Sequence, residues 1–505
     1  MFIRKKRNKS GSVSVQILEK VGRKNQLVQS VGCSSDEEEI EELVQEAQKL
    51  LPTLQKQSTI AFLSQKDEDI LNFVEQLNNA NITAVGAKLV FGRVFDEIGF
   101  DVIDEPLFKA LVLSRIIYQG SKLKLTEYLK RYEHQAISVQ RIYRFLDKYK
   151  EDVEKIAFEH TQKILGSISV MFYDMSTLYF EASDEDDFRR IGFSKDGKFQ
   201  SPQIMLGLLV GEKGYPIGYE LFEGNTFEGH TLIPVLEKFQ KKFNLTKPII
   251  VADSGLLSKG NIEQLIELDY QYIIGARIKN ESQTIKDAIL KFNLCEDGAS
   301  DSIDKGNNQK LIITYSEKRA KKDAYNRQKG LKKLEKRVTS GKLTKEHINN
   351  RGYNKYLTLK SDVQVEIDYS KFEADATWDG LKGYLTNTTL PNDTVISNYA
   401  NLWQIEKAFR MSKTDLAIRP IYHFTKRRIE AHISISFVAY TVYKELERLL
   451  YKYDAPFSVN KAREIIHNIY QIEITLPDSQ HKQEVLLNMD EEQQLLLKII
   501  HHEFG

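Results

Sequence analysis

Three acidic residues, Asp174, Asp253 and Glu406, occur in settings that could support metal-dependent chemistry. Asp174 follows the apolar run in VMFYD and Asp253 follows the one in IIVAD, so each is expected to end a buried strand. A carboxylate at a strand end is held rigidly and still reaches an open edge of the sheet, where sites in α/β proteins usually form. Taken alone, either aspartate could instead cap the following turn or helix.

Glu406 lies in the segment SNYANLWQIEKAFRMSKTDL, which predicts one helix around 398–416. Its buried stripe is expected to consist of Ile405, Phe409, Ser412 and Leu416. Tyr399, Glu406 and Lys413 are spaced by seven residues, so they should share one face beside that stripe. A carboxylate on a helix face could equally form a solvated ion pair, here with Lys413 or Arg410.

Taken together, three separated carboxylates suit the cleavage of a phosphodiester bond. That reaction needs an activated water or hydroxyl and a stabilised leaving oxygen, and two Mg²⁺ ions about 4 Å apart provide both. Mg²⁺ prefers oxygen ligands and keeps several waters, so a few carboxylates suffice to hold it, and Mn²⁺ is expected to substitute. Crowded carboxylates without cations would repel one another and take up protons. The ten histidines show no HExxH-like spacing, so nothing favours zinc.

Length and composition bound the class of protein. A chain of 505 residues suggests about two to four domains, and 41% apolar with 28% charged residues is typical of a soluble globular protein. The net charge of +1 can still conceal local basic patches. Two distant cysteines, Cys33 and Cys295, make neither a disulfide framework nor a thiolate metal site. With no secretory signal or membrane-length apolar run expected, we predict a cytoplasmic protein without membrane partners.

The order of elements predicts an α/β protein with helical regions on both sides. A strand, a turn at Gly22, a second strand and an acidic helix are expected first, and a helix-rich stretch follows. The alternation of strands and helices beyond it, with a hairpin at EKGYP, indicates a mixed sheet. The expected regions are an N-terminal hairpin with acidic helix (1–65), a helical region (66–165), the first part of the core (166–280), a β-containing insertion (281–380), the second part of the core with the glutamate helix (381–445) and a helical C-terminal region (446–505).

These residues also match a known family. The chain resembles bacterial insertion-sequence transposases of the DDE type, in the subgroup with a Tyr-Arg-Glu-Lys signature. That signature places two residues, three residues and six residues between its members, and three of the four positions match, as Tyr399, Glu406 and Lys413. The blocks YDMSTLYFE, GFSKDGKFQSPQIMLGLLV, PIGYELFEGNTFEGHT, VADSG and IRPIYHFTKRRIEAHISISFVAY are similar to the family as well, from about residue 100 to 445.

The resemblance implies a ribonuclease-H-like catalytic core interrupted by a β-containing insertion. The first, second and third acids of the family fall on Asp174, Asp253 and Glu406. The family's tyrosine and lysine fall on Tyr399 and Lys413, and in such enzymes they contact DNA phosphates near the cut.

One signature position departs from the family. Leu402 stands where the signature has arginine, and a leucine cannot hold a phosphate. Arg410 lies one turn beyond Glu406 and could supply that charge from the same helix. The alternative is that Leu402 simply packs and no residue takes the role of the arginine.

Two groups of basic residues are candidates for binding DNA. The run 317–345 is rich in lysine and arginine, with Lys332 and Lys333 near its centre, and is expected to follow the DNA backbone rather than form an ordinary solvated face. Arg141 and Arg144, in SVQRIYRFLDKY, are candidates for contacts with bases or phosphates, or are ordinary solvated residues.

Four further residues in or near the matching blocks could serve the chemistry. Asp196 in SKDGK and Glu228 in NTFEGHT are expected to have turn or capping roles rather than to bind metal. Trp378 or Trp403 could stack on a displaced base, although core packing is the better prediction for Trp403.

The leading hypothesis is a transposase that binds double-stranded element ends and target DNA. It would cut with Mg²⁺-activated water and use the freed 3′ hydroxyl to attack the target, as at least a homodimer that pairs two ends on the bacterial nucleoid. One rival is a metal-dependent nuclease with the same core and no strand transfer. A second rival is an inactive DNA-binding relic, against which the three intact acids argue.

Overall fold

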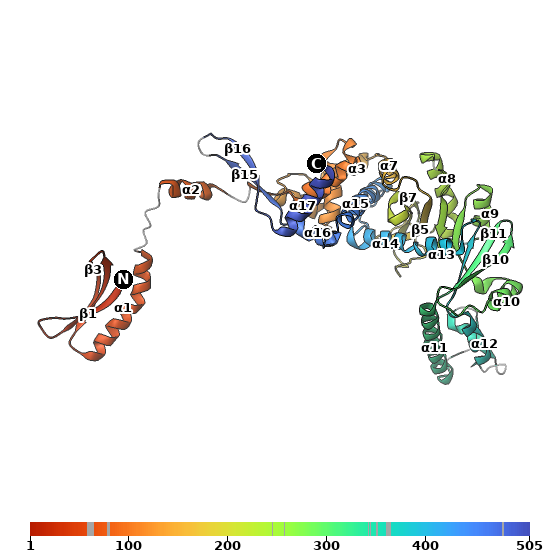
Figure 1. The fold of residues 1–505 in the computed structure, drawn as a ribbon, viewed down its shortest axis with the longest axis horizontal. Helices are drawn as coiled ribbons and strands as arrows, with labels where there is room; N and C mark the ends of the chain where they lie inside the picture. Colours follow the sequence, from red (N-terminus) through yellow and green to blue (C-terminus); the bar gives the residue numbers. More distant parts are fainter. Residues whose placement is uncertain are drawn as a thin grey trace. The chain divides into compact units, whose positions relative to one another are not determined.

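The computed structural model describes residues 1–57, 65–77, 81–244, 246–256, 258–341, 343, 345–349, 352–359, 365–476 and 479–505. The chain divides into two compact units (Figure 1). The N-terminal unit is Met1–Asn81 together with Ile474–Gln483, and the main unit is Ile82–Glu473 together with Glu484–Gly505.

The N-terminal unit is built on a three-stranded antiparallel sheet. Its strands are β1 (Phe2–Arg7), β2 (Val13–Val21) and β3 (Lys24–Ser34), in that order across the sheet, and its helices are α1 (Glu37–Gln57) and α2 (Gln65–Gln76). Helix α1 covers one face of the sheet over the buried residues Val15, Ile17, Ile40 and Ala47. The two strands and the acidic helix were predicted, whereas β1 was not, because FIRKKR has no alternation of apolar and polar residues.

A mixed sheet of eight strands forms the centre of the main unit, which confirms the predicted α/β class. The strands are β5 (Val170–Tyr179), β6 (Gln203–Gly211), β7 (Pro216–Glu223), β8 (Ile249–Ala252), β9 (Tyr272–Ala276), β10 (Ser300–Gly306), β11 (Gln309–Tyr315) and β14 (Leu381–Thr386), in the order β10-β11-β14-β9-β8-β5-β6-β7. The β5–β8 and β8–β9 pairs are parallel. Parallel neighbours need crossover connections, which α8 (Leu232–Phe243) and α9 (Lys259–Glu267) provide.

Both faces of this sheet are covered, so its central strands are apolar on both sides. All nine residues of β6 are buried. Residues of alternating parity enter two different cores, as Phe172 and Val251 do on one face and Tyr173 and Ile250 on the other. Asp174 and Asp253 share the parity of Phe172 and Val251, so the pleat directs them to the face that carries the helical core.

The helical core contains the region predicted as helix-rich. Its helices are α3 (Arg93–Ile98), α4 (Pro106–Ile117), α5 (Lys122–Tyr132), α6 (Val139–Lys148), α7 (Val153–Leu165), α15 (Lys426–Lys452), α16 (Val459–Ile466) and α17 (Glu491–Phe504). Strands β4 (Ile82–Ala84), β15 (Tyr470–Thr475) and β16 (Lys482–Leu486) form a small sheet that the sequence did not predict. No helix in the described part of the chain is both long and apolar enough to cross a membrane.

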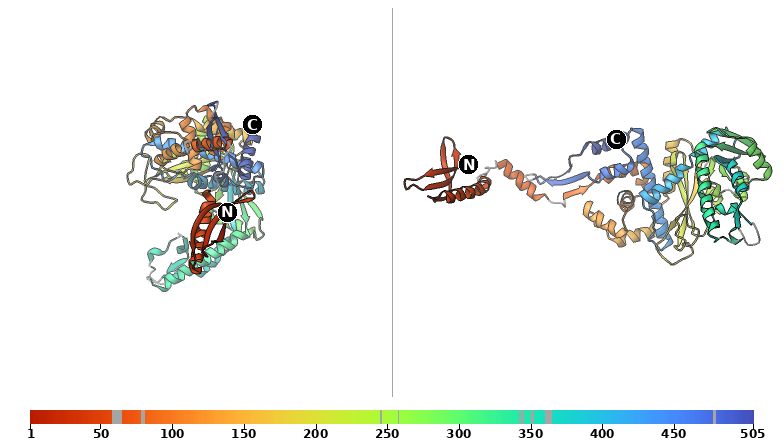
Figure 2. Two further views of the ribbon diagram at one scale, coloured as in Figure 1. Left: turned by 90° about the vertical axis from the view of Figure 1, so that its left-hand side faces the viewer. Right: turned by 90° about the horizontal axis from the view of Figure 1, so that it is seen from below.

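The region predicted as an insertion is divided between two environments. After α10 (Gln283–Lys291), its strands β10 and β11 extend the main sheet. The segment from α11 to α12 builds a separate small core and lies at the end of the main unit far from the C-terminus (Figures 1 and 2). It consists of α11 (Glu317–Thr339), β12 (Leu357–Leu359), β13 (Val365–Ile367) and α12 (Tyr369–Ala374). The sequence did not predict β10 and β11 individually, and these two strands belong to the main sheet.

Candidate active site

Asp174 of β5 lies beside Asp253, which directly follows the neighbouring parallel strand β8. The prediction that Asp174 ends its strand was wrong, because β5 continues to Tyr179 and pairs with β6 along its whole length. Strand β8 pairs with β5 only as far as the Tyr173–Ala252 pair. Asp253 follows β8 directly, as predicted, so both aspartates stand where the parallel pairing stops.

The carboxylate of Asp174 is partly shielded from water, and only 25% of its side chain is exposed. Its Oδ1 accepts a hydrogen bond from the Met175 N–H at 2.7 Å and lies 3.8 Å from Lys195 Nζ. Burial raises the pKa of Asp174 to about 6 against the opposing effect of Lys195, and the charges of Glu228 and Asp253 add to the increase. The charge of Lys195 therefore compensates the ionised carboxylate only in part.

Lys195 joins Asp174 to a further carboxylate that the sequence did not identify as part of the site. Its Nζ lies 2.7 Å from Glu228 Oε1 and donates to the Met175 carbonyl at 2.8 Å. Glu228 also reaches the turn after Asp253, since a Cβ placed on Gly255 would lie 3.6 Å from Glu228 Oε2. The expected turn or capping role does not describe the Glu228 side chain, which points to Lys195. The only signal for Lys195 was its position in the family-like block GFSKDGKF.

The prediction of a single helix around 398–416 was wrong. The structure has α13 (Asn392–Ala400), α14 (Trp403–Arg410) and a π-helical turn, η11 (Met411–Asp415). Between α13 and α14 the backbone tightens, because the Leu402 N–H donates to the carbonyl of Tyr399, three residues earlier, at 3.0 Å. Tyr399, Glu406 and Lys413 consequently lie in three different segments. The predicted buried stripe is confirmed for Ile405, Phe409, Ser412 and Leu416.

Tyr399 contacts the second aspartate directly. Its hydroxyl donates to Asp253 Oδ1 at 3.2 Å, and its ring lies beneath Lys382, whose Nζ is 4.4 Å from the ring centroid. Burial raises the pKa of Tyr399, and the charge of Asp253 raises it further, so the phenol remains a donor. A Cβ at position 275 of β9 would lie 2.5 Å from the Tyr399 hydroxyl, so any residue other than glycine there would displace that hydroxyl.

Glu406 is exposed on α14, and its charge acts on the same lysine, Lys382, as the charge of Asp253 does. Burial lowers the pKa of Lys382 and nearby Arg319 lowers it further, while the charges of Asp253 and Glu406 oppose that change. Lys382 on β14 is therefore within electrostatic range of two of the three predicted acids.

Lys413 lies at the opposite border of the site, half-buried. Its Nζ is 3.8 Å from Asp196 Oδ2, and Arg419 contacts the same carboxylate. Burial lowers the pKa of Lys413 to about 8, although the charges of Asp196 and Asp174 favour its ionised form. Asp196 is thus an ion-pair partner of two cations and not only a turn residue.

Leu402, where the sequence departs from the signature, and Arg410, its possible substitute, lie in different environments. Leu402 is buried in the helical core, as the packing alternative supposes, and Arg410 is exposed on α14. Trp403 was expected in the core, but it is 50% exposed, because α14 begins only after the turn at Leu402 and so presents Trp403 to solvent. Lys407 lies over its ring at 5.9 Å.

The predicted basic contact residues are on the surface. Arg141 and Arg144 are exposed on α6, whose buried residues are Ile142 and Leu146. Lys332 and Lys333 are exposed on α11 and line a shallow groove. These positions leave all four side chains accessible to a large ligand.

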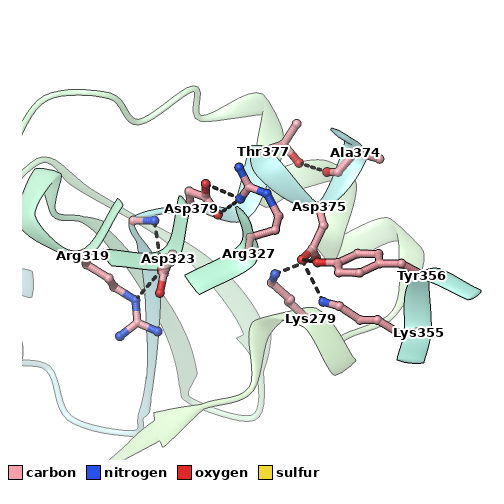
Figure 3. Close-up of polar contacts among 11 residues, drawn as sticks. Lys279, Arg319, Asp323, Arg327, Lys355, Tyr356, Ala374, Asp375, Thr377 and Asp379 are labelled. Atoms are coloured by element: carbon pink, nitrogen blue, oxygen red, sulfur yellow. Dashed lines mark hydrogen bonds and ion pairs between the residues drawn. The ribbon is translucent and has the colours of Figure 1, made fainter. Parts of the chain in front are cut away.

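A cleft of about 680 Å³ extends from Lys382 between the main sheet and the α11–α12 segment. Lys279, Lys355 and Tyr356 converge on Asp375 there, and Arg327 pairs with Asp379 (Figure 3). The hydrogen bonds from these partners hold the pKa of Asp375 well below its usual range, although burial opposes the shift. The cleft is lined by ordered ion pairs and leads from the acidic site toward α11.

The donor set fits a hard divalent cation. No group of three or more Asp, Glu, His or Cys side chains in the described residues is already arranged as a ligand set. Asp174 and Asp253 nevertheless offer adjacent carboxylate oxygens, with Glu406 on the helix that covers their face of the sheet. Oxygen donors of this kind suit Mg²⁺ or Mn²⁺, and the raised pKa of Asp174 indicates a carboxylate that a cation would stabilise.

The part of the chain that carries the acidic site matches a known protein family. The model of the family described as "Transposase DDE domain" matches residues 166–442, more than half of the 505 residues. The chain belongs to the transposase DDE domain family. The matched part of this DDE domain extends from just before β5 into α15 and so includes Asp174, Asp253 and Glu406.

Solved transposase structures show weaker similarity to the DDE transposase chain. The piggyBac transposase synaptic complex with hairpin DNA has a TM-score of 0.41 at 10% identity, over 75% of this chain and 76% of that one. The Mos1 transposase paired-end complex with left transposon end has a TM-score of 0.16 at 15% identity, over 30% of this chain and 53% of that one. No curated protein sequence matches the chain.

The packing of Tyr399 on Gly275 gives a prediction for this DDE domain. Gly275→Ala should push the phenol away from Asp253 and reduce DNA cleavage by about tenfold, because a packed strand cannot absorb the extra methyl group without displacement. In a Tyr399→Phe background the same substitution should reduce the cleavage rate much less, since the hydroxyl that the new methyl group would contact is absent. Cleavage rates of an oligonucleotide substrate for the four variants measure the coupling, and fully independent effects would contradict this packing role.

Proposed function

We propose that the chain is a DNA transposase of a bacterial insertion sequence, in the Tyr-Arg-Glu-Lys subgroup, with a ribonuclease-H-like core. It would bind the ends of its element, cut them with a divalent metal ion and join the freed 3′ hydroxyl to target DNA. The observation that carries the proposal is the placement of Asp174 and Asp253 side by side at the end of a parallel strand pair, within a transposase DDE domain. Glu406, on the covering helix, is the third proposed acid.

Each polar residue of the site has a proposed task. Asp174, Asp253 and Glu406 would hold Mg²⁺ or Mn²⁺, which when bound activates the attacking oxygen and stabilises the leaving one. Tyr399 orients the Asp253 carboxylate through its hydroxyl. Tyr399 and Lys413 would also contact the phosphates near the cut, for which Lys413 would have to exchange its ion pair with Asp196.

The remaining surface suggests a path for the DNA. Helix α11 would follow the DNA backbone with Lys332 and Lys333, and Arg141 and Arg144 of the helical region 66–165 would contact the element end. Arg410 would supply the phosphate contact that the signature arginine makes. We keep the six regions and their boundaries as predicted from the sequence. The active form would be a homodimer that pairs two element ends.

The role of α11 can be tested by the salt dependence of binding. Replacing Lys332 and Lys333 with Gln should weaken binding to any duplex and reduce the slope of log K against log salt by about two, one for each lost phosphate contact. The matched control replaces Lys259 and Lys291 with Gln. Both are also exposed, but they belong to α9 and α10, which pack on the face of the main sheet opposite the acidic site. An equal change of slope in both double variants would remove α11 from the proposed path.

A plasmid-joining assay separates the proposed transposase from its rivals. The full chain is incubated with Mg²⁺, a target plasmid and a duplex that carries the inverted repeat bordering the reading frame. A transposase gives joined product, a nuclease gives cut ends without joining, and an inactive relic binds the end without cutting. Asp174→Ala should bind the end as the wild type does and give neither product, and Mg²⁺-dependent cutting by this variant would refute the assigned site.

A further inference from the structure

The sheet of the N-terminal unit has one covered face and one open face. Helix α1 lies along one face of the sheet (Figure 1). Val15 and Ile17 of β2 are fully buried beneath it and pack with Ile40 and Ala47 of the helix. Because side chains alternate along a strand, the even-numbered residues of β2 point to the other side. The open face therefore carries the row Ser14, Gln16, Leu18 and Lys20 on β2, in which Leu18 is buried and the three polar residues are not.

The strand pairing extends this row across the open face. Arg4 of β1 is opposite Gln16, which is opposite Ser30 of β3. Lys6 is in turn opposite Ser14, which is opposite Cys33. These residues come from three strands, so they present one contiguous surface.

Hydrogen bonds fix several of these side chains in place. The Arg4 guanidinium donates to Gln16 Oε1 at 2.9 Å, and Asn8 Nδ2 donates to Ser14 Oγ at 2.7 Å and to Ser12 Oγ at 3.2 Å. Arginine, lysine, glutamine, asparagine and serine are the side chains that read base edges and hold phosphates. The open face is thus a preformed array of groups suited to nucleic acid.

Charge is separated across the N-terminal unit. The strands and their turns carry one acidic residue, Glu19, and eight basic ones, Arg4, Lys5, Lys6, Arg7, Lys9, Lys20, Arg23 and Lys24. The start of α1 and the residue before it carry no basic residue and seven acidic ones, Asp36, Glu37, Glu38, Glu39, Glu41, Glu42 and Glu46. A polyanion is attracted to the sheet and repelled from the helix, so it approaches the open face.

We propose that this open face binds duplex DNA in the major groove. The major groove, about 12 Å wide, admits a β-ribbon, and β-sheets serve as DNA readers in other folds. Arg4 and Gln16 lie at the centre of the face and would contact base edges, and Lys6 and Lys20 on either side would contact phosphates. The inference rests on the proposed transposase function and adds a second recognition surface to the helical region 66–165.

The strand β1 provides its own matched control. Lys5 and Arg7 alternate with Arg4 and Lys6 and point to the α1 side, where they border a groove lined by Glu37, Glu38 and Glu41. The double variants Arg4→Gln/Lys6→Gln and Lys5→Gln/Arg7→Gln therefore remove the same charge from the same strand on opposite faces.

The experiment measures DNA binding by the full chain. The probes are a fluorescein-labelled duplex that carries the element end and a scrambled duplex of equal length, followed by anisotropy at several salt concentrations. Arg4→Gln/Lys6→Gln should weaken binding to the end duplex at least about tenfold, and Lys5→Gln/Arg7→Gln should change it less than about threefold. Gln16→Ala, which removes no charge, should lower the preference for the end duplex and leave the salt slope unchanged.

Equal losses in the two double variants would overturn the inference, because the face would then not matter. Unchanged binding by Arg4→Gln/Lys6→Gln would also overturn it and leave the proposed function intact, provided that the wild type binds and cuts the end duplex. A wild type that binds neither duplex would defeat the proposed function as well. If the substitutions change only the oligomeric state in sedimentation, the open face binds a second copy of this chain, and the inference is wrong. Thermal unfolding of each variant verifies that it folds.

Discussion

Asp174→Asn is expected to abolish DNA cleavage and at the same time to make the protein more stable at neutral pH. The loss should be at least about a thousandfold, because the amide removes the negative charge of the proposed metal ligand at the centre of the site. The gain follows from the cost of keeping that negative charge in a partly buried position. Stability and activity would then be opposed at this one residue, as is usual for groups strained by function.

The pH dependence of the gain follows from the raised pKa. The unfolded chain ionises Asp174 near its ordinary pKa of 3.8, whereas the folded chain does so only at about 6. Between these values the folded state binds more protons than the unfolded state, so this residue lowers the stability progressively as pH rises through that window. A pKa shift of this size destabilises the folded state by at most about 3 kcal/mol. This destabilisation is complete above pH ~6 and absent below pH ~4.

Unfolding of the wild type and of Asp174→Asn should therefore be compared at pH ~8 and pH ~4, with a chelator to exclude divalent ions. The variant should unfold at higher denaturant concentration at pH ~8 and with the wild type at pH ~4. Asp301→Asn is the control, because Asp301 is an exposed aspartate on β10. A variant that is less stable than the wild type at pH ~8 would contradict the assigned environment of Asp174.

Local patterns in the sequence predicted most elements but not their neighbours in space. The apolar run that ends at Asp253 is enough to locate β8, and the run in β6 shows a strand buried on both faces. Strand β10 has only one apolar residue, Ile303, and β11 has the short apolar run LII, and no local feature tells that they join the main sheet, because pairing depends on residues far away along the chain. The same reason explains why β5 runs past Asp174. Its partner over that stretch is β6, not β8.

The sequence could predict the site residues that one strand positions. It could not predict the residues that several loops bring together. Asp253 could be located from its strand alone. Lys195 and Glu228 lie in connections between elements, and only the folded chain brings their side chains within 2.7 Å. The helix around Glu406 was misjudged because a turn with hydrogen bonds to the third preceding residue keeps helical backbone angles at Leu402, so the apolar pattern does not reveal the break.

Lys195 and Glu228 should have opposite effects on the affinity of the protein for a divalent ion. Lys195→Met should increase the affinity for Mn²⁺ at least about tenfold, which corresponds to ~1.4 kcal/mol, and Glu228→Gln should decrease it. The reason is the position of the ammonium, 3.8 Å from Asp174 and 2.7 Å from Glu228. It neutralises the carboxylates that a metal ion would otherwise neutralise, so it competes with the ion.

The size of the effect follows from the charges and their exposure. Two unit charges 4 Å apart interact by about 4 kcal/mol at the effective dielectric constant of a protein surface. Lys195 is 35% exposed, so water screens much of this repulsion between the ammonium and a bound cation, and about a tenfold change is expected. In Glu228→Gln, Lys195 loses its nearest partner and acts on Asp174 alone, which makes the competition stronger.

Binding and catalysis together distinguish a competitor from a participant. Mn²⁺ binding to the apo protein is measured from the signal of free Mn²⁺ in electron paramagnetic resonance, and cleavage is measured at saturating Mn²⁺. Lys198→Met is the control, because Lys198 belongs to the same loop but lies over the Tyr179 ring at 5.4 Å. We expect Lys195→Met to bind Mn²⁺ more tightly and yet to cleave at least about tenfold more slowly, since the ammonium displaced by the metal would otherwise stabilise charge on the phosphate. Weaker Mn²⁺ binding by Lys195→Met would show that the lysine organises the carboxylates for the metal instead of competing with it.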